Sequence, residues 1–174
     1  MKAALASVLV ACSSAVSPSQ VAVHFEGIRD VDEADLREVI HEGELKEPEG
    51  RRQDELWVLG ALYDRGYVQA KVTSSSATRA DGAVDVTFHI EEGARFRVGS
   101  LSVHERDSES ALAAFHRAEA GEWFSRKLVV EDIDELRALY VERGHKSARI
   151  TPIANVDPQK RTIDLDVVID PNGA

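Results

Sequence analysis

Histidines and closely spaced carboxylates are the side chains in this sequence that could carry out chemistry. Glu91 and Glu92 end a predicted strand, and the acidic run at 131–135 lies near a predicted helix start, where solvated acids interact favourably with the helix dipole. Catalytic carboxylate pairs need a pocket, which units of this size hardly provide. No two of the six histidines have a spacing that suits one metal ion: His24, His41, His89, His104, His116 and His145.

These features predict a protein that is not an enzyme and has no metal site or cofactor. An enzymatic function would need a deep pocket that holds two close carboxylates. The chain has 174 residues, with 31 acidic against 21 basic side chains and a formal charge of -10. This charge repels nucleic-acid phosphates and anionic lipid headgroups, so nucleic acid is excluded as a partner.

The single cysteine, Cys12, follows Lys2 and a short apolar stretch at 3–11, which together predict an export signal. The tetrad that ends at Cys12 resembles a bacterial lipobox, which implies cleavage before a lipidated cysteine. Ordinary cleavage after Ala15, or an unprocessed tail, is the alternative. Residues 13–20 contain a proline and four serines and predict a flexible tether, so 1–20 form a signal peptide with its tether.

The rest of the chain contains two copies of one sequence repeat. The block that begins Leu62-Tyr63 and contains Gly66 recurs as the block that begins Leu139-Tyr140 and contains Gly144. The glycines lie 78 positions apart, whereas the residues before them match best at an offset of 77, which pairs Tyr63 with Tyr140. We therefore expect one residue to be gained or lost at the helix end, and two small domains at 21–93 and 94–174.

Each copy predicts the same five elements. The first copy predicts a strand at 21–25, a helix at 33–42 capped by Asp32, a helix lined by Leu56, Leu59 and Tyr63 and ended by Gly66, and strands at 68–76 and 84–91 joined at Asp81-Gly82. The second copy predicts a strand at 96–103 broken by Gly99, a helix at 109–119 capped by Ser108, a helix capped by Ser125 and ended by Gly144, and strands at 146–155 and 162–170.

The fold class is α+β, with two tandem β-α-α-β-β domains. Each domain is predicted to form a three-stranded mixed sheet with two helices packed on one face, because a small sheet must cover its apolar face. Pro152 lacks an amide hydrogen and is confined to an edge strand or a bulge. The first hairpin strand should therefore be outermost, the last strand central and the leading strand on its other side.

The order of these motifs resembles that of POTRA (polypeptide-transport-associated) domains. The resemblance covers 21–170 and includes the segment 90–99 and the Gly121-Glu122-Trp123-Phe124-Ser125 run. It departs from the family pattern between Tyr63 and Gly66, where two residues replace the more usual three, and at His145, where a tyrosine is usual. A tandem pair of this kind, as in BamA and TamA, implies a periplasmic location ahead of an outer-membrane barrel in a Gram-negative bacterium.

The resemblance implies handling of unfolded outer-membrane or secreted proteins, or binding to a barrel assembly component. We expect the chain to serve as a scaffold or chaperone-like adaptor that binds by β-augmentation, and to meet the membrane only through a lipid anchor or a separate barrel. The alternatives are an interaction module that docks a folded envelope partner, and the N-terminal fragment of a POTRA-barrel transporter.

The expected binding edge is the first hairpin strand of the first domain, through Val68, Ala70, Val72, Thr73 and Ser75. An edge that is merely solvated is the competing interpretation. Trp57, Trp123, Tyr63 and Tyr140 are predicted to pack in cores or between domains, with Trp57 the better candidate for a partner contact. Tyr63 and Tyr140 should pack their helices, and Gly66 and Gly144 should end them.

Overall fold

The computed structural model describes residues 21–105 and 115–173, which form two small α+β units that each contain a three-stranded sheet. The elements of the first unit are β1 (Val21–Glu26), α1 (Glu33–Arg37), α2 (Pro48–Tyr63), β2 (Lys71–Thr78) and β3 (Val84–Glu91). Those of the second are β4 (Arg97–His104), α4 (Arg126–Glu142), β5 (Arg149–Asp157) and β6 (Thr162–Asp170). The helix predicted at 109–119 falls mostly outside the described residues.

The sheet topology confirms the predicted fold class and strand order. The orders are β1-β3-β2 and β4-β6-β5, with the last strand of each unit in the centre. In each sheet the leading strand pairs with the central strand in parallel, and the hairpin strand pairs with it in antiparallel. Pro152 lies in β5, at an edge where its missing amide hydrogen is tolerated.

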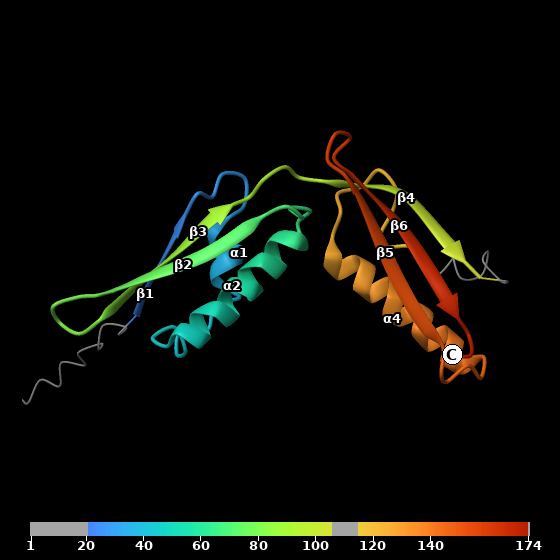
Figure 1. The fold of residues 1–174 in the computed structure, drawn as a ribbon, viewed down its shortest axis with the longest axis horizontal. Coiled ribbons are helices and arrows are strands. Elements are labelled where there is room, and N and C mark those ends of the chain that lie inside the picture. Colours follow the sequence, from blue (N-terminus) through green and yellow to red (C-terminus); the bar gives the residue numbers. More distant parts are fainter. Residues whose placement is uncertain (1–20, 106–114, 174) are drawn as a thin grey trace, which may run out of the picture.

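Both units place their helical layer on the same, lower side of a bent molecule (Figure 1). The segment between β3 and β4 runs along the upper side and carries the chain from one unit to the next. The C-terminal end of α2 points towards the second unit, whereas the C-terminal end of α4 lies far from the first unit, near the end of the chain.

Polar side chains set where the helices begin. The carboxylate of Asp32 accepts the Ala34 amide at 2.9 Å, and the hydroxyl of Ser125 accepts the Leu128 amide at 3.3 Å, as the sequence predicts. The first helix is shorter than predicted and ends at Arg37 instead of residue 42. The amide of His41 donates to the Asp54 carboxylate at 2.9 Å, and this bond replaces the one to a helical carbonyl.

The predicted one-residue shift between the two long helices is wrong. The Tyr67 amide donates to the Leu62 carbonyl, and the His145 amide donates to the Tyr140 carbonyl, so the helix ends match at an offset of 78. Leu62 is fully buried and Tyr140 is 2% exposed, which places them at equivalent core positions. Tyr63 is only half-buried and Leu56 is 58% exposed, so neither belongs to the predicted core stripe.

Buried carboxylates hold the chain that precedes each long helix. Asp54 and Asp132 lie one offset of 78 apart and are 1% and 0% exposed. Asp54 accepts the amide and the ring nitrogen of His41, and Asp132 accepts the amides of Arg117 and Ala118. A buried carboxylate is stable when amide donors replace its water, so these residues pin the loops to the core.

A β-bulge interrupts β4, as Gly99 predicts. The pairing of β4 with β6 shifts between Val98 and Leu101. A Cβ on Gly99 would lie 2.3 Å from the Asp164 carboxylate, which accepts the amide and the hydroxyl of Ser100 at 2.7 and 2.9 Å. The missing side chain therefore makes room for the carboxylate that secures the bulge.

Candidate interaction surfaces

The β2 edge is exposed along its length, but it begins later than the sequence predicts. Val68 and Ala70 precede the strand in a turn closed by the bond from the Ala70 amide to the Tyr67 carbonyl, at 3.1 Å. Ala70 is 6% exposed, and Val68 packs against the core of the second unit. The prediction that Val68 and Ala70 belong to the binding edge is therefore wrong, because both side chains pack inwards before the strand begins.

Val72, Thr73 and Ser75 do lie in β2, on two different faces. Val72 pairs with the buried Ile90 and faces the helices, whereas Thr73 and Ser75 pair with His89 and Thr87 on the outer face. The helix-facing positions that follow are Ser74 and Ser76, so the edge carries small polar side chains. Such side chains leave the strand's outward backbone groups accessible to an added strand.

Helix α2 closes the inner side of this edge through one polar contact. The Ser74 hydroxyl donates to the Glu55 carboxylate at 2.6 Å. Because this contact lies on the helical face, it leaves the backbone groups on the open side of β2 uncovered. A segment added there would extend the sheet without displacing the helix.

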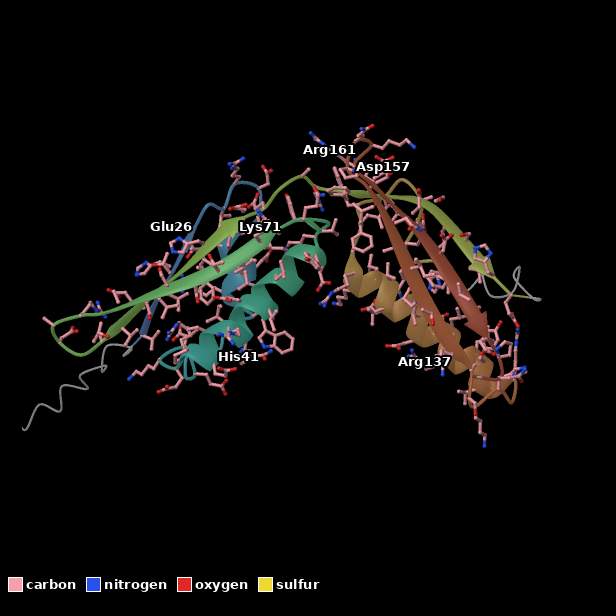
Figure 2. The ribbon with its side chains drawn as sticks, in the orientation of Figure 1. Glu26, His41, Lys71, Arg137, Asp157 and Arg161 are labelled. Atoms are coloured by element: carbon pink, nitrogen blue, oxygen red, sulfur yellow. The ribbon has the colours of Figure 1, made fainter. Side chains whose placement is uncertain are left out.

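The outer face of the first sheet carries a polar groove beside the start of β2. Its volume is about 320 Å³, and Glu26, Lys71, Thr73 and His89 line it. The ring of His89 bridges the Glu26 carboxylate at 3.1 Å and the Ser75 hydroxyl at 2.9 Å, and thus ties all three strands together. Figure 2 shows Glu26 and Lys71 on this outer face, with His41 on the helical side.

The β5 edge differs from β2 because it exposes apolar side chains. Pro152, Ala154 and Val156 pair with the buried residues Val167, Leu165 and Ile163, so they point towards the core side of the sheet. All three are nevertheless exposed, since the described helix α4 does not cover this edge. The sequence analysis did not predict this strip, although Pro152 and Val156, two positions to either side of Ala154, are apolar residues on the same strand face.

Comparison with known proteins identifies the family. A protein-family model described as POTRA, surface antigen variable number repeat, matches residues 21–93 and 97–172. The chain belongs to the POTRA family. The family match and the two repeated sheets together establish the tandem organisation that the sequence predicts.

Solved POTRA structures share the fold at low sequence identity. Haemophilus influenzae BamA POTRA3-5 is 19% identical with a TM-score of 0.68, and the match covers 86% of this chain and 64% of that one. POTRA1-3 of the periplasmic domain of Omp85 from Anabaena is 17% identical with a TM-score of 0.52, and the match covers 84% and 58%. The chain thus spans about 64% and 58% of these fragments. No curated protein matches it in sequence.

Trp57 lies beside a groove between the two POTRA domains. The groove has a volume of about 560 Å³, and residues from α1, α2 and the start of α4 line it, including Val39, Trp57, Gly60 and Arg126. The indole is 48% exposed and lies 6.1 Å from the His41 ring. Trp57 is therefore accessible to a partner in this structure.

Trp123 takes part in the joint between the POTRA domains. The guanidinium groups of Arg95 and Arg97 both lie over its ring, with their central carbons 4.3 and 3.8 Å from the ring centroid. Arg95 also donates to the Arg65 carbonyl of the first domain at 2.8 Å. Cation-π contacts of this kind orient the connecting segment against the second domain.

Burial affects the ionisation of one residue beside this joint. The low exposure of Tyr67, followed by the charges of Asp30 and Glu92, raises the pKa of its hydroxyl. Glu92 itself is 4% exposed and accepts the amides of Arg29, Asp30 and Val31. The carboxylate thus anchors the loop before α1 to the end of the first POTRA domain.

The structure describes no feature that indicates a metal site or a membrane span. Within 21–105 and 115–173, no three histidine, cysteine or acidic residues form a group that could hold a metal ion. None of the helices among the described residues is long and apolar enough to cross a bilayer. Cys12, the predicted lipidation site, lies outside the described residues.

Proposed function

We propose that this protein is a non-catalytic periplasmic adaptor in the assembly or secretion of outer-membrane proteins of a Gram-negative bacterium. It would bind extended segments of unfolded client proteins by adding them as a strand beside β2. Family membership supports this proposal, as does likeness to the POTRA domains of BamA and to the periplasmic domain of Omp85. The observation that carries it is the open β2 edge.

The chemistry of this edge suits clients of varied sequence. Main-chain hydrogen bonds supply affinity whatever the client side chains are, and side-chain pockets supply selectivity. On the helical face Ser74 and Ser76 present small side chains, and on the outer face Thr73 and Ser75 do the same. The edge therefore offers backbone pairing with little selection among clients.

Paired proline substitutions test this proposal. Neighbouring residues of an edge strand point their amides alternately to the sheet and to solvent, so one of Thr73→Pro and Ser74→Pro removes only an outward amide. That variant should keep its fold and lose at least tenfold in affinity for an unfolded barrel-precursor peptide, measured by fluorescence anisotropy. His24→Pro on β1, the opposite edge, is the control.

Two results would contradict the proposed site. The first is unchanged peptide affinity in both β2 proline variants while circular dichroism shows an intact fold. The second is an equal loss of affinity in His24→Pro, which would place client binding at β1 or make it independent of a particular edge.

The β5 strip favours a second candidate function, the docking of a folded envelope partner. Val156 is 45% exposed, and the exposed Pro152 on the same face of β5 cannot donate a hydrogen bond to an added strand. Apolar exposure suits a folded surface better than backbone pairing. Val156→Ser with Ala154→Ser should abolish capture of a folded partner from envelope extract and leave precursor binding unchanged.

We also propose that lipidation of Cys12 tethers the protein to the membrane. The lipobox-like tetrad and the serine-rich segment 13–20 support this anchor. Mass spectrometry of the mature N-terminus should find a diacylglyceryl-modified Cys12 as its first residue. A mature chain that begins at Val16 would exclude the anchor.

A further inference from the structure

Basic side chains gather at the junction of the two domains, where the chain enters β4. Arg95 and Arg97 lie on either side of the buried Phe96. Their guanidinium carbons are 4.3 and 3.8 Å from the centroid of the Trp123 ring, which is 39% exposed. The two cations are therefore close to each other, because both are held against one indole.

Neither of these guanidinium groups is neutralised by an acid. Nε of Arg95 donates to the Arg65 carbonyl at 2.8 Å, and Nη1 of Arg97 donates to the Gly121 carbonyl at 2.7 Å. Both acceptors are uncharged, and within 21–105 and 115–173 neither guanidinium has a carboxylate at ion-pair distance. Two close cations without a shared anion repel each other, so their arrangement favours the binding of an anion.

The carboxylates that flank this group in the sequence or in the sheet are directed elsewhere. Glu92 is 4% exposed and accepts three backbone amides of the loop before α1. Asp164 accepts the amide and the hydroxyl of Ser100 at 2.7 and 2.9 Å. Glu122 precedes Trp123 in a segment that pairs with β4, so its side chain points to the opposite face from the indole.

A third arginine lies beside this group. The Arg97 amide donates to the Arg161 carbonyl at 2.9 Å, which places the turn between β5 and β6 against the start of β4. The Arg161 side chain is exposed and has no ion-pair partner in the described part of the chain. Figure 2 shows Arg161 and Asp157 at this turn, above the junction. The Asp157 carboxylate lies 3.4 Å from the Lys160 ammonium and accepts its amide.

The number of donors favours phosphate over a carboxylate as the anion. One guanidinium matches the two oxygens of a carboxylate, whereas a phosphate group presents at least three acceptor oxygens and can be shared by two guanidinium groups. The formal charge of -10 disfavours a polyanion. A single phosphate is less affected, because salt screens charges beyond about 8 Å at physiological ionic strength.

We propose that Arg95, Arg97 and Trp123 form a binding site for a single phosphate group, with Arg161 at its edge. The guanidinium groups donate to the phosphate oxygens, while cation-π contacts with the indole hold both groups in place. Free inorganic phosphate and the headgroup of a zwitterionic phospholipid share this chemistry. The proposal does not depend on client binding at β2.

The indole of the site provides the probe. The chain has two tryptophans, so Trp57→Phe leaves Trp123 as the only one. Inorganic phosphate that replaces chloride at constant ionic strength should give a saturable change in the Trp123 emission. Arg97→Gln in this background should raise the half-saturating phosphate concentration about tenfold, because charge-assisted hydrogen bonds are lost.

Two further substitutions separate phosphate binding from a loss of structure. Arg161→Asn removes a charge outside the packed junction, and asparagine tolerates the φ of +55° at this position. It should raise the half-saturating concentration about threefold, since it removes only a neighbouring charge. Arg137→Gln on α4 is the matched control, because it removes an exposed arginine that pairs with Asp134, and it should change nothing.

Vesicles identify the source of the phosphate. Phosphatidylcholine with phosphatidylethanolamine presents phosphate groups without a net charge. A blue shift of the Trp123 emission on these vesicles, lost in Arg97→Gln, would support the proposal with a lipid headgroup as the ligand. Saturation by inorganic phosphate without a response to vesicles would support it with a soluble phosphate.

Two results would overturn the proposed site. One is a Trp123 emission that responds neither to inorganic phosphate nor to the vesicles. The other is a half-saturating concentration that Arg97→Gln and Arg161→Asn leave as unchanged as Arg137→Gln does, while near-ultraviolet circular dichroism shows an intact fold. If Arg97→Gln alone fails to fold, Arg161→Asn decides between the two outcomes.

Discussion

Leu62 and Tyr140 occupy the same position in the two domains, although one side chain is aliphatic and the other aromatic. Each carbonyl accepts the amide five residues later, from Tyr67 at 3.0 Å and from His145 at 2.9 Å. Both side chains are buried, and the Tyr140 hydroxyl donates to the Glu105 carboxylate. The two cores are therefore filled differently at a shared point.

Alanine substitutions should reveal this equivalence. Leu62→Ala and Tyr140→Ala should each cost about 3–5 kcal/mol of unfolding free energy, because each leaves a cavity in a closed core. Tyr63→Ala should cost about 1 kcal/mol, since Tyr63 is half-buried. Urea unfolding measures all three. If Tyr63→Ala lowered the unfolding free energy as much as Tyr140→Ala, the two tyrosines would occupy equivalent core positions, and the match of Leu62 with Tyr140 would be contradicted.

Gly66 and Gly144 should respond differently to the same substitution. Alanine at either position bears the cost of a positive φ, which is +90° and +93°, on the order of 1–2 kcal/mol. At Gly66 the new methyl group also meets two carbonyl oxygens of the second domain, which should cost about 1–3 kcal/mol more. Urea unfolding and small-angle X-ray scattering should show that only Gly66→Ala also loosens the junction.

Asp132 should be among the most sensitive positions of the second domain. Asp132→Ala removes the acceptor of the Arg117 and Ala118 amides and the partner of the Arg117 guanidinium, and should cost about 3–5 kcal/mol. Asp132→Asn should cost less, because its amide oxygen still accepts one backbone amide. Equal losses in the two variants, measured by thermal unfolding, would contradict the role of its two oxygens as separate acceptors.

Ionisation of Asp164 should make the stability of the second domain vary with pH in the acid range. The backbone amide of Ser100 and then its hydroxyl hydrogen-bond the carboxylate and lower the pKa of Asp164 from its ordinary value of 3.8. Folding thus favours the ionised form of the carboxylate. Its contribution to the free energy of unfolding is complete above the ordinary pKa and is lost as the pH falls through the lower pKa of the folded protein.

The matching experiment compares the protein with Asp164→Asn between pH 2 and pH 6. The difference in unfolding free energy should be constant above roughly pH 5 and should shrink as pH falls below about 4. The lowered pKa of Asp157, whose carboxylate accepts the Lys160 amide, acts in the same direction in both proteins. A difference that grows towards low pH would contradict the assigned sign.

Local chemistry explains why much of the fold was predictable. Ser125 caps α4, Asp81-Gly82 turns the first hairpin and Gly66 ends α2, and each acts through residues only a few positions away. Pro152 even indicated the order of the strands, because a missing amide hydrogen restricts where a strand can lie.

The register of α2 and the start of β2 were not predictable in this way. Apolar spacing favoured Leu56 and Tyr63 as core residues, but α2 buries its opposite face, on which the Asp54 carboxylate accepts the His41 amide. Val68 looked like the start of a strand, yet it packs against the second core. Both outcomes depend on partners that periodicity does not identify.

The sequence by itself determined that this protein is two copies of one β-α-α-β-β unit, because capping, turn and periodicity signals act over short distances along the chain. Only the tertiary structure decided which edges stay open and how the copies join. Asp64 meets Arg126 across 62 positions of sequence, and the Gly66 carbonyl meets the Phe96 amide across 30. Such contacts arise from the packing of whole domains, which no local pattern specifies.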